Sequence, residues 1–279
     1  MNVLVTGGCG FLGKYVMKAL PQAVSFDNLD PLCGGTGVAD IFGDVSSLDT
    51  LKSVIREYGI THIVHLAAYG RNLTCQNFPE SAWRTNVTGT FNVLEAARQL
   101  DVKRVVCASS NITLSDQPTV YKTTKKACED LVSLYATMGV SCMALRPSNI
   151  YGKGQSKSEY QPCAFAGLDK SYAEKGYFTI TGDGTQSRDW THAQDVARAF
   201  VLALFSDISG VSYDVCTGSL TSMNTIAGIL DVDVKYVPAR PGDAKELVSD
   251  PGPATDIGFL AQIKLQNGIW DAFPEVKKR

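Results

Sequence analysis

An apolar run passes directly into closely spaced glycines in Asn2-Val3-Leu4-Val5-Thr6-Gly7-Gly8-Cys9-Gly10-Phe11-Leu12-Gly13. The β-branched and apolar residues of the run predict a short buried strand. Apolar residues at helical spacing follow the glycines and predict a helix that ends before Pro21. A strand, a glycine turn and a helix in this order are typical of a site for a dinucleotide pyrophosphate.

The glycines of this turn have separate expected tasks. Gly7 permits the tight turn, Gly10 lets the backbone approach the pyrophosphate, and Gly13 lets the helix pack close to the strand. The N-terminus of the helix adds amide donors and a positive dipole end. The alternative is a glycine-rich turn without a ligand. The spacing G-x-x-G-x-x-G resembles that of short-chain dehydrogenases and reductases.

A second apolar strand over residues 23–26 ends at Asp27-Asn28, which favours NAD over NADP. A carboxylate at this place accepts hydrogen bonds from the ribose hydroxyls and repels a 2′-phosphate. Lys and Arg are absent between Lys18 and Lys52, so no nearby cation is available to pair with such a phosphate. The alternative for Asp27 is a solvated loop carboxylate.

Strands and helices alternate through the first half of the chain. We expect strands at residues 62–67, 104–109 and 141–146, and helices at residues 79–100 and 120–138. This order predicts an α/β fold, a Rossmann-type doubly wound parallel sheet with ligands at the carboxyl ends of its strands.

The element order becomes irregular from Ser148 onward, which predicts a second, smaller unit. We expect an NAD-binding Rossmann domain over residues 1–165, to which residues 185–215 return. Residues 166–184 and 216–279 are expected to form a smaller C-terminal substrate-binding lobe.

Composition limits the function classes. The chain has 279 residues and a net charge of −2, which argues against a nucleic-acid partner or an anionic membrane surface. The first strand begins at residue 2, which leaves no room for a signal peptide, and no apolar run reaches membrane-spanning length. The eight cysteines are scattered singly and there are three histidines, so we expect no metal site and a reducing, cytoplasmic location.

A candidate catalytic group lies in the expected helix over residues 120–138. Tyr121 and Lys125 are four residues apart and therefore share a helix face. The ammonium group stabilises a phenolate, which can take a proton from a substrate hydroxyl, and it can also bind the nicotinamide ribose. Ser109-Ser110 closes the preceding strand, where a hydroxyl can hold the substrate oxygen. The choice between Ser109 and Ser110 stays open, as does a simple cap role for Ser110.

These residues resemble the extended short-chain dehydrogenase family of NAD-dependent nucleotide-sugar epimerases and dehydratases. Further blocks carry the resemblance, at residues 43–45, 65–68, 86–97, 146–152, 182–190 and 240–243. With the glycine turn, it implies NAD contacts from Gly7, Gly10, Phe11, Leu12, Asp27, Asn28, Asp44, Val45, Leu66, Ala67, Ala68, Asn86, Ser109, Tyr121, Lys125 and Pro147.

The resemblance also implies contacts to a nucleoside-diphosphate sugar from Ser110, Asn149, Arg188 and Arg240. Guanidinium groups suit a diphosphate because they bind it bidentately and keep their charge. The alternatives are an ion pair between Arg188 and Asp189 and a solvated loop charge for Arg240. Residues 111–118 depart from the family because they are short and lack its usual Val-Tyr-Gly segment.

The two residues after Ser110 reduce the number of family reactions that this chain is expected to catalyse. The family's 4,6-dehydratases carry an Asp-Glu pair there and its decarboxylases tend to carry a glutamate, whereas this chain has Asn111 and Ile112. The 3,5-epimerase/reductases use a Cys and a His, and no Cys lies beside Ser110. A 4-epimerase needs only Ser110, Tyr121, Lys125 and NAD, and the Asp27-Asn28-Leu29 turn is similar to that of UDP-galactose 4-epimerases. A dehydratase, decarboxylase or 4-keto reductase, or a non-catalytic NAD-binding regulator, remains the alternative.

The resemblance further implies a homodimer built from the helices at residues 79–100 and 120–138. Two helices from each partner would bury a stripe of Leu131, Leu134, Tyr135 and Met138. The alternative is that this stripe packs only against its own sheet.

Overall fold

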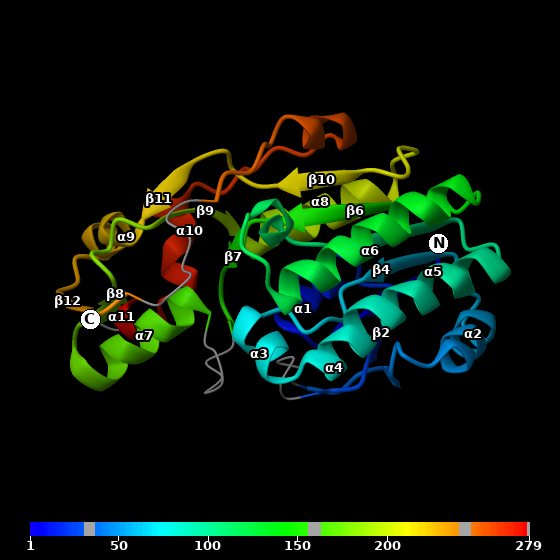
Figure 1. The fold of residues 1–279 in the computed structure, drawn as a ribbon, viewed down its shortest axis with the longest axis horizontal. Helices are drawn as coiled ribbons and strands as arrows, with labels where there is room; N and C mark the ends of the chain where they lie inside the picture. Colours follow the sequence, from blue (N-terminus) through cyan, green and yellow to red (C-terminus); the bar gives the residue numbers. More distant parts are fainter. Residues whose placement is uncertain (31–36, 156–162, 240–246, 278–279) are drawn as a thin grey trace.

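The computed structural model describes residues 1–30, 37–155, 163–239 and 247–277. Within these ranges the chain forms a large lobe around a seven-stranded sheet and a small lobe beside it (Figure 1). In the same ranges, no helix combines the length and the apolar character that a membrane crossing requires.

The large lobe is built on a parallel sheet with the strand order β10-β6-β5-β4-β1-β2-β3. Its strands are β1 (Val3–Thr6), β2 (Val24–Asp27), β3 (Ile41–Phe42), β4 (His62–His65), β5 (Arg104–Ala108), β6 (Cys142–Pro147) and β10 (Ser212–Val215). Chain order reverses between β1 and β4, which places a ligand site at the carboxyl ends of these strands. The predicted doubly wound α/β fold is confirmed.

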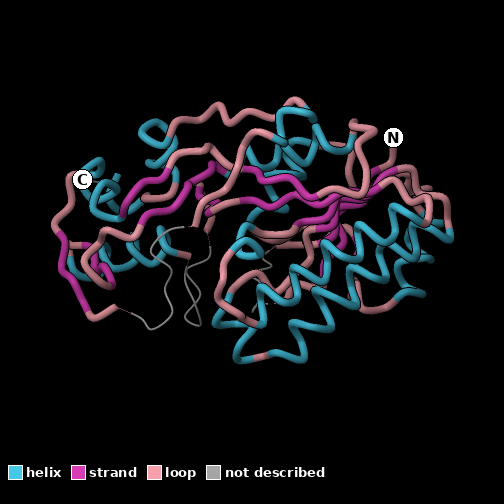
Figure 2. The backbone as a smooth tube through the Cα atoms, turned by 45° about the horizontal axis from the view of Figure 1, so that its top comes forward, coloured by secondary structure: helices cyan, strands magenta, loops and turns pink. Residues whose placement is uncertain are grey.

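Both faces of the sheet are buried, because helices cover each one (Figure 2). Alternate residues of β1 point to opposite sides, so Leu4 enters one core while Val3 and Val5 enter the other. The first core is covered by α2 (Leu48–Glu57), α5 (Gly89–Gln99) and α6 (Val120–Thr137), and the second by α1 (Phe11–Ala19) and α8 (Ala193–Leu204).

The helix expected over residues 79–100 is present as three joined segments. They are α4 (Pro79–Trp83), a π-helical turn (Arg84–Thr88) and α5, and α3 (Asn72–Asn77) precedes them. Helix α6 begins at Val120, as expected, because Thr119 caps it by accepting a hydrogen bond from the Lys122 amide.

The small lobe has its own aromatic core. Phe165 stacks on Trp190 with ring centroids 4.1 Å apart, and Phe273 packs against Phe165. The strands here are β7 (Asn149–Tyr151), β8 (Phe178–Thr181), β9 (Ser187–His192), β11 (Leu220–Ser222) and β12 (Val234–Val237). The helices are α7 (Ala164–Lys175), α9 (Met223–Leu230), α10 (Leu265–Gly268) and α11 (Pro274–Lys277).

The chain returns from the small lobe to the large one twice. Residues 193–215 supply α8 and the sheet-edge strand β10, which pairs with β6. A 3₁₀ helix at Pro253–Ile257 then packs Ala254, Ile257 and Phe259 into the core beside α1 and α8. Residues 253–259 therefore lie on the large lobe, although the sequence predicted the small lobe for residues 216–279.

The apolar stripe predicted to form the dimer contact is only partly exposed: two of its four residues pack into the core and two lie on the surface. Tyr135 is buried and its hydroxyl donates to Glu95 at 3.0 Å, and burial raises the pKa of Tyr135 to about 12. Leu131 packs against the same core. Leu134 and Met138 are 53% and 49% exposed, so the exposed apolar surface of this stripe is smaller than the sequence suggested.

Candidate functional site

Close packing around the glycine turn after β1 leaves no room for a side chain at Gly7 or Gly13. Gly7 has φ +71°, and a Cβ on it would lie 2.6 Å from the amide nitrogen of Ala67. A Cβ on Gly13 would lie 2.1 Å from the carbonyl oxygen of Gly7. The first turn of α1 is therefore pressed against the loop, with its N-terminus at the end of β1.

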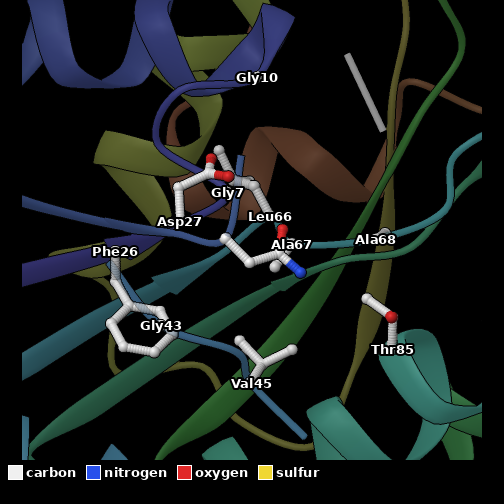
Figure 3. Close-up of a pocket in the computed structure, with 11 residues that line it drawn as sticks. Gly7, Gly10, Phe26, Asp27, Gly43, Val45, Leu66, Ala67, Ala68 and Thr85 are labelled. Carbon is white, nitrogen blue, oxygen red and sulfur yellow. The ribbon is translucent and has the colours of Figure 1, made fainter. Parts of the chain in front are cut away.

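A pocket opens beside this turn, at the carboxyl ends of β1, β2 and β4 (Figure 3). It is lined by Gly7, Gly10, Phe26, Asp27, Asn28, Gly43, Val45, Leu66, Ala67, Ala68 and Thr85. Eight of these eleven were predicted from the sequence as cofactor contacts. The structure thus gathers five separate segments around one space that begins at the glycine turn.

Asp27 lies at the end of β2 with its carboxylate directed toward the glycine turn (Figure 3). Oδ2 accepts a hydrogen bond from the Cys9 amide at 2.9 Å, and Oδ1 accepts one from the Leu29 amide at 2.7 Å. Each carboxylate oxygen retains a further lone pair. The buried carboxylate is therefore fixed in place and still able to accept from ribose hydroxyls.

Three lining residues were not predicted as contacts. A Cβ on Gly43 would lie 2.5 Å from the ring of Phe26, so the ring and the glycine form one wall together. Gly43 lies in the segment at residues 43–45 that resembles the family, so the sequence did contain a pattern that could have identified it as a pocket residue. Thr85 belongs to the π-helical turn, and Phe26 lies in the apolar strand β2, where a core residue is expected. No sequence pattern predicts that either residue lines a pocket.

Other predicted cofactor residues lie around the pocket rather than in its lining. Phe11 and Leu12 open α1, Pro147 ends β6, and Asp44 accepts a hydrogen bond from the Ser46 amide at 2.8 Å. Asn86 is buried in the π-helical turn. Its side chain binds both backbone groups of Tyr69, at 2.8 and 3.1 Å, and the Thr124 hydroxyl at 3.0 Å.

His65 lies buried at the end of β4, directly before the pocket residue Leu66. Its ring nitrogens contact the hydroxyls of Thr6 at 2.7 Å and Thr90 at 3.1 Å. Burial, reinforced by the charge of Lys125, lowers the pKa of His65 to about 3. The imidazole is therefore neutral at physiological pH and acts as a polar support for the site.

The candidate catalytic residues gather where β5 ends and α6 begins. Lys125 is buried and donates from Nζ to the carbonyl oxygen of Ala108 at 2.7 Å. Tyr121, one turn earlier in α6, packs against the buried cluster of Tyr69, Cys75 and Ala82. Ser110 follows β5 and caps a 3₁₀ helix (Asn111–Leu114) by accepting from the Ile112 amide at 3.3 Å.

Ser109 and Ser110 differ in their surroundings. Ser109 is buried, and its hydroxyl donates to Glu129 Oε1 at 2.6 Å, so its proton already takes part in a hydrogen bond within the protein. Ser110 is only partly buried, and its oxygen accepts a single long hydrogen bond. This difference favours Ser110 as the hydroxyl that is open to a ligand.

The predicted substrate residues lie on the paired strands β7 and β9. Asn149 stands opposite Trp190, and its amide nitrogen lies 3.4 Å from the carbonyl oxygen of Asp189. Arg188 donates to the carbonyl oxygen of Ser187 at 2.8 Å. Successive strand side chains point to opposite faces, so Arg188 and Asp189 diverge. Arg240 lies outside the described residues.

Asp189 has a structural task of its own. Its carboxylate accepts hydrogen bonds from the backbone amides of Thr217, Gly218 and Ser219 at 2.6–3.1 Å, and from the Ser148 hydroxyl at 3.2 Å. It thereby ties β9 to the turn between β10 and β11. Among the described residues, no cluster of three metal-binding side chains occurs.

Comparisons with known proteins show the family of the chain. The model of the NAD dependent epimerase/dehydratase family matches residues 3–216. The UDP-glucose 4-epimerase of Mycolicibacterium smegmatis is 29% identical over 96% of both chains. The solved structure of Thermus thermophilus UDP-glucose 4-epimerase with NAD is 28% identical over 99% of both chains, with a TM-score of 0.83. MoeE5 in complex with UDP-glucose and NAD is 30% identical over 100% of this chain and 99% of that one, with a TM-score of 0.85.

Proposed function

The chain belongs to the NAD-dependent epimerase/dehydratase family, and from that membership we propose that it interconverts the C4 epimers of a nucleoside-diphosphate hexose. The observation that supports the proposal is the position of the candidate catalytic residues next to the dinucleotide pocket. Ser110 follows β5, Lys125 donates to the last residue of β5, and Tyr121 lies one helical turn before Lys125. Strand β5 is the neighbour of β4, at whose carboxyl end the dinucleotide pocket opens. That arrangement suits reversible oxidation of a hydroxyl group.

The pocket fits NAD, the cofactor of the family. Gly7 and Gly10 line the pocket and α1 begins directly after them, which suits a pyrophosphate, and Asp27 offers a fixed carboxylate to the ribose. When bound, NAD supplies a nicotinamide that accepts a hydride and returns it. We assign the adenosine half to the lining residues Asp27, Asn28 and Val45.

The chain's own residues handle the proton and the orientation of the sugar. Tyr121 removes the proton from the C4 hydroxyl and later returns it, while the Ser110 hydroxyl holds the same oxygen. Lys125 is fixed by Ala108 and supplies a positive charge one helical turn from the phenol. The resulting 4-keto sugar presents its other face to the nicotinamide before it is reduced.

Asn149, Arg188 and Arg240 are proposed to hold the nucleoside diphosphate, which leaves the sugar free to turn. We further propose the division into a Rossmann domain and a substrate-binding lobe, with two changes to the predicted bounds. Residues 254–259 are assigned to the large lobe, and strands β7 and β9 are assigned to the small one. A cytoplasmic location suits the cysteines of the described residues, which are all free.

A 4-epimerase is favoured over the family's other reactions by the residues after Ser110. Asn111 is buried, and its amide donates to the Ser249 hydroxyl at 3.4 Å, so it cannot serve as an acid or base there. Ile112 has no titratable group. A dehydratase needs such groups to expel water from the keto sugar, and Ser110, Tyr121 and Lys125 have no evident use in a non-catalytic regulator.

The test is to incubate the protein with UDP-glucose and its dTDP, GDP and CDP counterparts and to identify the products by NMR. We expect a C4 epimer with no net formation of NADH, because the hydride is returned in every cycle. Free glucose should react very poorly, since the diphosphate provides most of the binding. A 4-keto-6-deoxy sugar, a decarboxylated pentose or stoichiometric use of NAD(P)H would replace the proposal with a dehydratase, a decarboxylase or a reductase.

We also propose a homodimer. The outer faces of α4, α5 and α6 expose the large apolar side chains of Trp83, Phe91, Leu134 and Met138. The three helices lie side by side on one face of the large lobe (Figure 1). Pairing of these faces between two copies would form a helical bundle and cover the exposed side chains.

A further inference from the structure

A buried carboxylate with no assigned role lies on the helix that carries Tyr121 and Lys125. Glu129 follows Lys125 by four residues in α6, so the two side chains share a helix face. Glu129 is almost fully buried. A carboxylate is costly to bury without partners, so its contacts indicate what it holds in place.

Glu129 ties the end of β5 to α6. Its Oε1 accepts a hydrogen bond from Ser109 Oγ at 2.6 Å and lies 3.1 Å from Thr113 Oγ1. The Thr113 hydroxyl also lies 2.9 Å from the carbonyl oxygen of Ser110, so its single proton is shared between these two acceptors. One carboxylate thus holds the chain on both sides of Ser110.

Arg146 on β6 fixes this carboxylate from the opposite side. Its Nε and Nη2 contact the two oxygens of Glu129 at 2.6 and 2.9 Å, and its Nη1 reaches Asp214 on β10 at 3.4 Å. Burial raises the pKa of Glu129, but hydrogen bonds from Arg146 and Ser109 outweigh it and bring the pKa below its usual range. Glu129 is therefore a charged, rigidly held anchor.

We propose that Glu129 is a positioning residue, which sets the Ser110 hydroxyl at the correct distance from the Tyr121 phenol. It can do so because it joins the backbone around Ser110 to the helix that carries Tyr121. The inference rests on the proposed function, in which Ser110 and Tyr121 bind the same substrate oxygen. Displacement of a reacting group by about 1 Å can cost roughly 10²-fold in rate.

The first measurement compares the steady-state kinetics of the NAD-loaded protein with those of Glu129→Gln. We expect kcat to fall by roughly 10- to 100-fold, while KM and the bound NAD content stay unchanged. The matched control is Asp195→Asn, which removes another buried carboxylate paired with an arginine, Arg198, at 3.0 Å. This control should keep its kcat.

A double-mutant cycle separates positioning from a general loss of stability. If Glu129 acts through Ser110, Glu129→Gln should lower kcat by less than about threefold in a Ser110→Ala background. Equal losses in both backgrounds would overturn the proposal. If Glu129→Gln does not fold, Thr113→Val takes its place and keeps the ion pair. It should lower kcat by roughly threefold to tenfold, since one neutral hydrogen bond is lost, and full activity would contradict the proposal.

Hydrogen–deuterium exchange of residues 108–115 provides a readout that does not depend on turnover. In the NAD-loaded protein, Glu129→Gln should exchange faster over this segment than the wild type, and Asp195→Asn should not. Unchanged exchange in Glu129→Gln overturns the proposal. An inactive wild-type protein would instead contradict the epimerase function, and exchange would then decide the role of Glu129 alone.

Discussion

At the scale of single residues, the site depends on one phenol, one ammonium group and one carboxylate whose surroundings differ sharply. Lys125 and Asp27 are buried and held by backbone groups, whereas Tyr121 is partly exposed at the start of α6. The fixed charge of Lys125 therefore lies one helical turn from a phenol that is accessible to a ligand. Such an arrangement is typical of preorganised catalytic sites.

Replacing Tyr121 with Phe should nearly abolish turnover and leave NAD binding intact, because the ring stays and only the proton-transferring oxygen is lost. General acid–base groups of this kind contribute about 10²–10⁴-fold in rate. Turnover is followed by NMR and NAD content by absorbance of the released cofactor. Tyr135→Phe on the same helix is the matched control, and it should keep its activity. A Tyr121→Phe protein that retained a tenth of the wild-type rate would refute the catalytic assignment.

At the scale of elements, the close contact between the glycine turn and α1 shapes the pocket. Gly13→Ala would place a Cβ 2.1 Å from the Gly7 carbonyl oxygen, so α1 must move away from the turn. We expect the free energy of unfolding to drop by about 1–3 kcal/mol, as in other overpacked sites. NAD affinity should fall as well, because the helix N-terminus leaves its place. Both are measured by denaturant unfolding and calorimetry.

Gly228→Ala in α9 is the control for that substitution. Its backbone has no positive φ, and a Cβ there would meet no atom within 4 Å. Alanine is the better helix former, so this variant should be neutral or more stable by up to about 1 kcal/mol. Loss of NAD affinity in Gly228→Ala, or its retention in Gly13→Ala, would show that the contact is not what shapes the site.

The sequence predicted those elements whose patterns are local and strong. Helix α6 has a capping threonine and periodic apolar residues, and its predicted range of 120–138 differs from the observed one by a single residue. Five of the seven parallel strands of the large lobe, β1, β2, β4, β5 and β6, lie in apolar stretches that predicted them, whereas the short strand β3 and the edge strand β10 were not predicted. The fold class followed from their alternation with helices.

Elements and contacts that depend on distant partners were not predictable in this way. Strand β8 pairs with β12, more than fifty residues later, and neither segment shows by itself which strand it will pair with. Thr85 lines the pocket because a π-helical turn interrupts the helix, and Glu129 gains its partners only when β5, β6 and α6 pack together. Both depend on tertiary packing, which a single sequence does not display.

At the scale of the whole molecule, the free energy of unfolding should depend on pH because the imidazole of His65 is buried. Its pKa in the folded protein is about 3, below the ordinary value of 6.5, so only the unfolded chain takes up the proton between these two pH values. The stability present above pH 6.5 is therefore lost as the pH falls toward 3, by about 1.4 kcal/mol for each pH unit.

Denaturant unfolding of the wild type and of His65→Gln at pH 7 and pH 5 checks this expectation. The glutamine has no titrating group, so the wild type should lose about 2 kcal/mol more than the variant between these pH values. Other titrating groups contribute equally to both proteins and cancel in the comparison. Parallel pH profiles would show that the imidazole is not held neutral by the fold.

The assembly of two chains is tested by light scattering. The wild type should give twice the chain mass of 30.0 kDa at micromolar concentration. Replacing Leu134 and Met138 together with lysine should yield a monomer, because like charges would then face each other across the pairing. Phe205→Lys alters an exposed apolar residue at the end of α8 and should leave the dimer intact. A monomeric wild type would rule out the dimer.

The late return of the chain to the large sheet also has a consequence for synthesis. Strand β6 lacks its outer neighbour until residues 212–215 have left the ribosome, and residues 254–259 close over the same lobe later still. A nascent chain that stopped at Pro147 would expose an unpaired strand edge and an uncovered apolar face. The large lobe should therefore fail to accumulate as an excised fragment, even though its glycine turn, Tyr121 and Lys125 all lie within the first half of the chain.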